Sequence, residues 1–379
     1  MLNHNYRKNL QFFLVMSILA TLTVSLCSYL KKLPILPEGP AVQIAAVTRS
    51  LWEEGTLHPE HFSKIYVKAA ELSRVNSTVV WQDVFAIDKH GELIQKHSLF
   101  SAIAAVPFYA IFGNFGFWLF QLLFTLLLLL STYKIVEELN QSGLPWSTFV
   151  ATTLLSQTLF YSYDFSYELH GCALIMAGLW ISLSHPFWGG ILLGLSVFVS
   201  PANILLALPL AFLKVKSSKS TASIILSLLG LGIISILFLI TNYLLWGNPF
   251  STAYSNLLSF HNGEAIYSAH PIGFNLEVFK SNWPEKIFSS EGILPYNLSF
   301  IALPFAIKAS WQHVERSFLL RCFLVGLAFN LYIFSYPMWA TTFYGNRYIF
   351  TGIYLYLLSL IVWLGQFENL KKKKLSFDF

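Results

Sequence analysis

The chain has 379 residues, of which 55% are hydrophobic and 11% are charged, and its formal net charge is +5. A soluble globular domain carries roughly a quarter charged residues, so this composition excludes an ordinary soluble protein and indicates a surface that largely faces lipid. The basic run at 371–374 directly follows an apolar stretch, which indicates a cytoplasmic membrane anchor and not a nucleic-acid-binding patch.

A helix needs about 20 apolar residues to cross the hydrocarbon core of a bilayer. The clearest candidates lie at 10–30, 115–135, 147–163, 169–184, 221–246, 318–336 and 349–366. Two shorter runs, 187–199 and 202–213, meet at Ser200-Pro201, where the proline would break a helix, and another short run covers 298–311. The sequence therefore predicts an all-α polytopic membrane protein, a bundle of about ten transmembrane helices.

One more apolar segment, 99–113, could either cross the membrane or lie along its surface. Laid on the surface, it leaves both termini in the cytoplasm and puts the basic residues that flank the helices on that same side, as the positive-inside rule requires. Pro107 and Gly113 also suit a short interfacial helix. We therefore expect one membrane domain, residues 1–379, with two long outer loops at 31–114 and 247–295.

The first outer loop begins with an acidic residue next to a predicted helix. Glu38 precedes Pro40, and proline is well suited to the first turn of a helix, here at 41–54. The positive end of that helix favours an ionised carboxylate. Glu38 could therefore be a general base at the membrane surface, or an acid that only caps the helix.

The same loop contains a predicted hairpin. Segments 83–88 and 92–96 flank Lys89-His90-Gly91, a pattern typical of a β-hairpin with glycine in its turn. The hairpin would bring Lys96 and His97 to the start of the interfacial helix. There the two side chains could hold a lipid phosphate, or could anchor the chain among the headgroups.

Two further groups of polar residues lie at predicted outer turns. Asp164, Glu168 and His170 offer oxygen and nitrogen ligands for a divalent cation, although their spacing matches no strict metal motif and the nearby tyrosines could form an interface belt. Arg347 precedes the last apolar run, where its guanidinium could bind phosphate or extend to the headgroups. No phosphate-binding loop, zinc-protease motif or dinucleotide fingerprint stands in its required context, which argues against a soluble-type nucleotide-using enzyme.

The chain resembles the bacterial GT-C superfamily of integral-membrane glycosyltransferases, which includes protein O-mannosyltransferases and lipid A aminoarabinose transferases. Five segments in order carry the resemblance: "LPEGPAVQIAAVTRSLWEEGTL", "DVFAIDKHGELIQKHSLFSAIAAVPFYAIFG", "GGILLGLSVFVSPANILLALPL", "WGNPFSTAYSN" with "SSEGILPYNLSF", and "TTFYGNRYIF". Each segment alone is degenerate, whereas their order and spacing across residues 36–350 are fairly specific. Glu38 stands where the family usually has aspartate, and Ser200 stands where a basic residue often precedes the proline.

The resemblance implies transfer of a sugar, with inversion, from a polyprenyl-phosphate donor to an extracytoplasmic acceptor, which could be a glycan, a lipid or a protein. It implies a bacterial cytoplasmic (inner) membrane protein, with Glu38 as the general base. No cofactor is certain, and a divalent cation is the one candidate. Lys96, His97 and Arg347 would hold the donor phosphate, and Asp164, Glu168 and His170 would orient the acceptor or hold the metal. The outer-loop contacts with substrate would come from Tyr254, His261, Glu264, Glu291, Tyr344 and Tyr348.

Two other functions stay open at this point. A transporter or flippase for a lipid-linked saccharide should have inverted repeats and broken helices that meet at the middle of the membrane. In the sequence, Ser200-Pro201 is the one obvious break, and the polar residues gather on one face. The second alternative is a non-catalytic GT-C relative that acts as an assembly partner, which the departures at Glu38 and Ser200 would explain.

Overall fold

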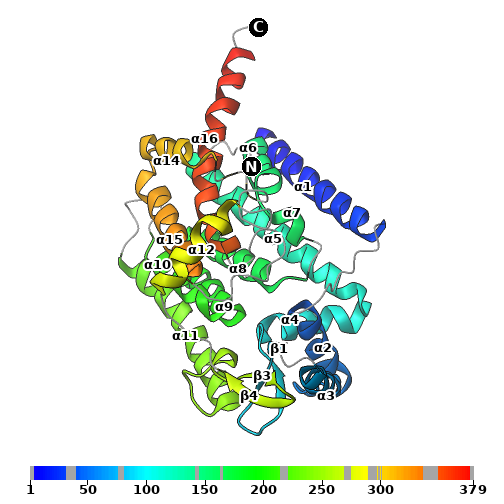
Figure 1. Cartoon of the computed structure of the whole chain (residues 1–379). Coiled ribbons are helices and arrows are strands. Elements are labelled where there is room, and N and C mark those ends of the chain that lie inside the picture. Colours follow the sequence, from blue (N-terminus) through cyan, green and yellow to red (C-terminus); the bar gives the residue numbers. More distant parts are fainter. Residues whose placement is uncertain are drawn as a thin grey trace.

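The computed structural model describes residues 4–30, 40–75, 81–140, 145–162, 165–213, 221–268, 275–288, 297, 299, 301–335 and 349–375. This part of the chain is mostly helical and contains one four-stranded sheet. Figure 1 shows a bundle of helices with the sheet at one end, while the last turns of α16 project from the opposite end. We call α2, α3, α4 and the sheet together the cap.

The helices of the bundle follow the apolar runs of the sequence. They are α1 His4–Leu30, α5 Phe115–Asn140, α8 Tyr167–Ser182, α9 Pro186–Val199, α10 Ile204–Ala211, α11 Thr221–Trp246, α14 Leu303–Gln312, α15 Arg316–Phe334 and α16 Phe350–Leu375. Among the described residues, Phe115–Leu139, Thr221–Trp246 and Arg316–Phe334 are long and apolar enough to cross a membrane. The other apolar helices are shorter. A helical membrane protein is therefore well supported, whereas a total of about ten crossings stays a prediction.

Glycines allow the central helices to approach one another closely. A Cβ atom at Gly190 of α9 would lie 2.0 Å from the Ser227 carbonyl oxygen of α11, and one at Gly230 of α11 would lie 2.2 Å from the Phe187 carbonyl oxygen. Small residues are common at such interfaces in membranes, because packing of the backbones replaces the hydrophobic driving force that is missing in lipid. The glycines within the apolar run of α9 thus help to determine that this helix packs against α11.

The continuous helix predicted at 147–163 is wrong. The chain instead forms α6 Pro145–Phe149, the π-helical turn η1 Val150–Leu154 and the short helix α7 Thr158–Tyr161. Side-chain hydroxyls bond to the backbone along this stretch: Thr152 Oγ1 donates to Thr148 O (2.7 Å) and Ser156 Oγ donates to Thr152 O (2.5 Å). Such bonds offer carbonyls an alternative to regular helix and often bend it. A prediction from hydropathy alone does not take these side-chain hydrogen bonds into account.

The short run at 298–311 also differs from the prediction. Its helix, α14, begins only at Leu303, with Pro304 in the first turn, where proline is tolerated because the first amides of a helix have no partner within it. The break at Ser200-Pro201 is confirmed: α9 ends at Val199, and the 3₁₀ turn η2 Pro201–Asn203 leads into α10.

The cap contains the helices expected in the first outer loop. The helix predicted after Pro40 is α2 Pro40–Glu53, and the segment predicted to lie on the surface is α4 Leu99–Phe112, which packs on α2 and α5. Tyr109 of α4 donates a hydrogen bond to Glu53 of α2 (2.5 Å). This bond, together with burial, raises the pKa of Tyr109, so the phenol remains a donor. Helix α3 Glu60–Val75 was not predicted.

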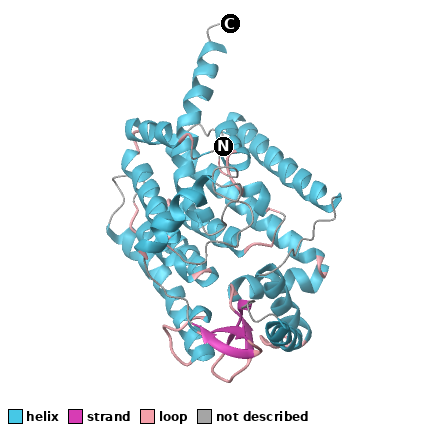
Figure 2. Ribbon diagram, viewed as in Figure 1, coloured by secondary structure: helices cyan, strands magenta, loops and turns pink. Residues whose placement is uncertain are grey.

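The sheet joins the two segments that the sequence predicts as outer loops. Its strands are β1 Trp81–Ile87, β2 Leu93–Gln95, β3 Leu257–His261 and β4 Glu264–Ser268, in the antiparallel order β2-β1-β3-β4. The predicted first hairpin is confirmed, while the second was missed; Figure 2 shows the strands gathered below the helices. The turn Asn262-Gly263 has positive φ at both residues (52° and 84°), which asparagine and glycine adopt most easily. The 3₁₀ turn η3 Ala253–Ser255 precedes β3, and α12 Leu276–Phe288 follows β4.

Candidate functional site

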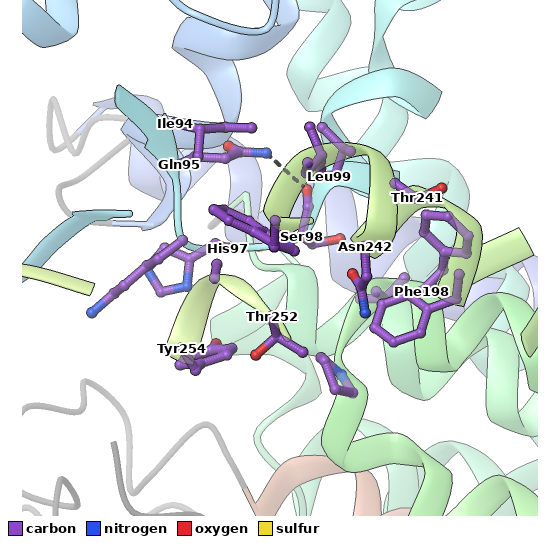
Figure 3. A pocket seen from close by; sticks show the side chains of 17 residues that line it. Ile94, Gln95, His97, Ser98, Leu99, Phe198, Thr241, Asn242, Thr252 and Tyr254 are labelled. Atoms are coloured by element: carbon purple, nitrogen blue, oxygen red, sulfur yellow. Dashed lines mark hydrogen bonds between the residues drawn. The ribbon is translucent and has the colours of Figure 1, made fainter. Parts of the chain in front are cut away.

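A cavity lies where the cap meets the bundle (Figure 3). It has about 580 Å³ of empty space, part of it open to solvent. The end of β2 and the start of α4 form one wall, the break after α9 a second, the last turns of α11 a third, and the segment around η3 the fourth. The lining residues are Ile94, Gln95, Lys96, His97, Ser98, Leu99, Phe198, Val199, Pro201, Phe238, Thr241, Asn242, Leu245, Trp246, Thr252, Ala253 and Tyr254. The cavity therefore brings together Lys96, His97 and Tyr254, three residues predicted from sequence.

The polar wall is built by the hairpin and the first turn of α4. Ser98 caps this helix by accepting a hydrogen bond from the Ser101 amide (3.1 Å), and Gln95 Nε2 donates to the Ser98 carbonyl (3.2 Å). Gln95 Oε1 is buried and has no hydrogen-bond partner among the described residues. His97 is buried, and its ring stacks on that of Tyr167 at the start of α8, with centroids 5.2 Å apart. A lysine, an imidazole and a helix N-terminus at one wall favour an anionic group.

The walls from α9 and α11 are mainly apolar, with Thr241 and Asn242 as their polar members. Phe198 and Phe238 meet edge to face, with ring centroids 5.4 Å apart, and Leu245 and Trp246 complete this side. Helix α11, which carries three of these four residues, exposes a long series of apolar side chains: Ile225, Leu226, Leu229, Ile233, Ile236, Leu237, Ile240 and Leu244. Such a surface suits contact with lipid chains. A ligand with a charged head and an apolar tail therefore matches the cavity best.

Backbone hydrogen bonds hold the walls together. The Lys89 amide donates to the Leu245 carbonyl (2.8 Å), which ties the turn between β1 and β2 to the end of α11. The Ile87 amide donates to the Asn256 carbonyl (3.1 Å), which ties β1 to the segment around η3. The cavity is thus made of the first hairpin, the segment around η3 and the bundle at once.

His170 does not line this cavity. It lies fully buried in α8, where its Nδ1 is 2.9 Å from Ser101 Oγ and its Nε2 is 2.8 Å from Gln121 Oε1. Gln121 Nε2 in turn donates to the Tyr161 carbonyl (2.5 Å), so Gln121 Oε1 is the acceptor and His170 Nε2 carries the proton. Ser98 Oγ donates to Ser101 Oγ (3.0 Å), which leaves the Ser101 hydroxyl hydrogen for His170 Nδ1. Both ring nitrogens are therefore used in linking α4, α5 and α8.

The other predicted residues are spread over the cap and beyond it. Glu168 is buried in the first turn of α8 and accepts a hydrogen bond from Ser166 Oγ (2.8 Å). His261 and Glu264 flank the turn between β3 and β4, and the exposed Glu264 is not part of the cavity lining. The predicted residues that lie outside the described part of the chain are Glu38, Asp164, Glu291, Tyr344, Arg347 and Tyr348.

One group of ligand-type side chains was missed. His58, Asp88 and Glu92 offer ligand atoms that all lie within 4.8 Å of one another. Asp88 and Glu92 flank the predicted Lys89-His90-Gly91 turn, so two of the three could have been found from the hairpin. His58 follows α2, and nothing in its local sequence indicates that it meets this turn.

We also compared the chain with known proteins. No family model, no curated protein and no solved structure matches it. The function must therefore be argued from the residues and from the cavity.

Proposed function

We propose that this protein is an integral-membrane glycosyltransferase that moves a sugar from a polyprenyl-phosphate donor to an extracytoplasmic acceptor. One observation supports the proposal above the others: Lys96 and His97 share a cavity with the apolar side chains at the end of α11. A polyprenyl-phosphate sugar needs such a combination, since its phosphate requires a positive environment and its chain requires an apolar one. The resemblance to GT-C enzymes supplies the reaction.

In the proposed reaction, the acceptor hydroxyl oxygen attacks the anomeric carbon from the face opposite the phosphate. A bond forms between these two atoms while the bond between the anomeric carbon and the phosphate oxygen breaks, which inverts the configuration. Glu38 takes the hydroxyl proton as general base. The phosphate leaves with the negative charge on its oxygen, and Lys96, His97 and Arg347 stabilise that charge. No nucleotide is required, because the phosphate already activates the sugar.

The first turn of α4 adds to the positive environment at Lys96 and His97. Its amides carry the partial positive charge of a helix N-terminus, and the Ser98 side chain occupies the Ser101 amide. The buried Gln95 Oε1, which has no hydrogen-bond partner in the described structure, can accept a hydrogen bond from a sugar hydroxyl. We assign Gln95 to the sugar side of the donor on this basis.

The experiment uses the full-length protein, purified in detergent and incubated with a panel of polyprenyl-phosphate sugars together with glycan, lipid and protein acceptors. Release of free polyprenyl phosphate is the expected result, and Glu38→Gln should abolish it without loss of folding. Arg347→Ala should weaken donor binding. Glu60→Gln is a matched control, because Glu60 is an exposed acid on α3 that pairs with Lys64 and does not line the cavity. If folded wild-type protein releases no carrier from any donor, the proposal is wrong.

The transporter alternative gains one observation. Besides the break after α9, the π-helical turn η1 interrupts a second apolar segment, and discontinuous helices are characteristic of transporters. In proteoliposomes, a flippase would move the intact lipid-linked saccharide between leaflets without releasing free carrier phosphate. The same panel of donors therefore distinguishes the two functions.

A further inference from the structure

Three side chains with ligand atoms for metals converge on the outer side of the cap. His58 lies between α2 and α3, while Asp88 and Glu92 lie at the turn between β1 and β2. His58 Nε2 is 3.2 Å from Asp88 Oδ2, and His58 Nδ1 is 2.9 Å from Glu92 Oε2. The Asp88 side chain is 3% exposed, while that of Glu92 is 59% exposed. One carboxylate is thus fixed and the other is free to adjust.

Asp88 is held rigidly by the turn that it begins. Its Oδ1 accepts hydrogen bonds from the His90 amide (2.8 Å) and the Glu92 amide (2.9 Å). This bonding fills one oxygen and leaves Oδ2 directed toward His58. A metal ligand needs this kind of support, because ligating carboxylates are themselves oriented by hydrogen bonds from their surroundings.

The contact between His58 and Asp88 is incomplete as an ion pair. His58 Nε2 is buried and makes no hydrogen bond within the described part of the chain, although Asp88 Oδ2 is only 3.2 Å away. A protonated imidazole clasped between two carboxylates would donate a hydrogen bond from each nitrogen. A buried nitrogen facing a buried carboxylate oxygen without such a bond is better satisfied by an ion that both atoms ligate.

The balance of charge around His58 also favours a bound cation. Among the described residues, neither Asp88 nor Glu92 pairs with a lysine or an arginine, and His58 is the one basic group between them. Two carboxylates that converge on one imidazole leave excess negative charge at a partly buried position, which a cation would neutralise.

We propose that His58, Asp88 and Glu92 bind a divalent transition-metal ion of the Zn²⁺ class. A nitrogen ligand with two carboxylates suits such an ion better than Ca²⁺ or Mg²⁺, which prefer oxygen ligands alone. Ligand bonds to Zn²⁺ are about 2.0–2.2 Å long, which puts tetrahedral ligand atoms roughly 3.3–3.6 Å apart. The ligand atoms lie within 4.8 Å of one another, so the most distant pair has to close by at most about 1.5 Å. The exposed Glu92 can make that movement, and water completes the coordination.

The ion would connect two parts of the cap that are separate in the chain. His58 belongs to the connection between α2 and α3, and Asp88 and Glu92 belong to the hairpin whose second strand leads directly to Lys96 and His97. Metal binding therefore fixes the hairpin that forms one wall of the cavity. The proposal concerns metal binding alone and does not depend on the proposed transfer reaction.

The test uses full-length protein in detergent, stripped with a chelator and titrated calorimetrically with Zn²⁺. We expect one ion to bind per chain and the unfolding temperature to rise. Loss of one of the three ligands should weaken binding by about 10–100-fold or more, because losing a group that only supports a ligand already costs that much. His58→Gln and Glu92→Gln should both show this loss, and Mg²⁺ should not replace Zn²⁺.

His90→Gln is the matched control, because His90 is an exposed imidazole on the same turn that does not belong to the group. It should bind Zn²⁺ as the wild type does. Glu92→Gln guards against misfolding, since Glu92 is largely exposed and its replacement cannot disrupt a core. The proposal is overturned if the wild type binds no Zn²⁺, or if Glu92→Gln and His58→Gln bind it as tightly as the wild type. In that case the three side chains form only a cluster of ion pairs.

Discussion

Two polar regions lie on either side of the first turn of α4, and they differ in how their polar groups are satisfied. On the inner side, Ser101, His170 and Gln121 form a continuous chain of hydrogen bonds that ends on the Tyr161 carbonyl. On the outer side, Lys96 and His97 line a cavity that is partly open to solvent. The inner residues satisfy one another, while the outer residues face space that a ligand can fill.

The comparison separates two kinds of polar residue in an apolar protein. Both kinds look alike in the sequence, because each is a histidine or a polar group next to apolar runs. A buried polar group that has all its partners rigidifies the packing, and its loss is felt as lost stability. A polar group that faces a cavity contributes little to stability and can bind a ligand. Substitutions in the inner region should therefore mainly lower stability, and substitutions at the cavity should mainly lower activity.

The largest expected loss of stability comes from His170→Leu. The substitution leaves Gln121 Oε1 and the Ser101 hydroxyl buried without their partner, and each orphaned group costs about 1–3 kcal/mol. Thermal unfolding in detergent measures the effect. His185→Leu is the control, because His185 is exposed between α8 and α9. Unchanged stability with abolished transfer would place His170 in the reaction and remove the distinction between the two regions.

A double substitution sharpens the same point. His170→Leu with Gln121→Leu should destabilise the fold by less than the sum of the two single changes, because the double variant no longer leaves either side chain facing a lost partner. Coupling between contacting residues is typically about 0.5–3 kcal/mol. The free energies of unfolding of the four proteins in the cycle measure it. Strict additivity would mean that the two side chains act independently.

An intermediate loss is expected for Asn242→Leu. Asn242 lines the cavity but also donates one hydrogen bond to the Pro249 carbonyl (3.2 Å), so it belongs partly to both kinds. One lost hydrogen bond corresponds to about 0.5–1.5 kcal/mol of unfolding free energy. The variant should also bind donor less well in a titration. A stability loss as large as that of His170→Leu would contradict the ranking.

The smallest loss of stability should accompany the largest loss of function. Lys96→Met keeps the length of the side chain and removes its charge, so unfolding should change by less than about 1 kcal/mol. Transfer should fall by roughly 10–100-fold, because a hydrogen bond to a charged group is worth about 1.5–3 kcal/mol. Lys64→Met, at an exposed position of α3, is the control. Full transfer activity in Lys96→Met would show that the donor phosphate does not bind in this cavity.

Much of the helical framework could be predicted, because its physical causes are local. An apolar run of sufficient length gives Thr221–Trp246, a proline in the first turn gives the start of α2, and a glycine turn gives the first hairpin. The prediction that the 99–113 segment lies along the membrane surface needed charge in addition to hydropathy, and the structure bears out only its helix, α4. Lys96 and His97 were predicted because they lie beside such a local feature, whereas Tyr254 was predicted from the resemblance alone.

The remaining features depend on contacts between distant parts of the chain. The interruption at 147–163 coincides with hydroxyl groups of Thr152 and Ser156 that bond to backbone carbonyls. The neighbouring Thr158 hydroxyl bonds to that of Tyr354 in α16. The Asn262-Gly263 pair is a sequence signal for a hairpin turn, and it was missed because a search for membrane spans does not consider turns. The burial of His170 could not be predicted from the sequence, because its partners Ser101 and Gln121 come from two other helices.

The pairing of β1 with β3 also sets an order for biogenesis. All the helices from α4 to α11 lie between these strands in the chain, and synthesis proceeds at about 5–20 residues per second, so β1 emerges many seconds before its neighbour exists. During that interval its edge is open to wrong partners, a recognised hazard for unpaired strands. The cavity wall is complete only once α11 has been inserted and β3 has arrived. A chain halted before that point would have no assembled cavity, so an unfinished protein could not act on a ligand.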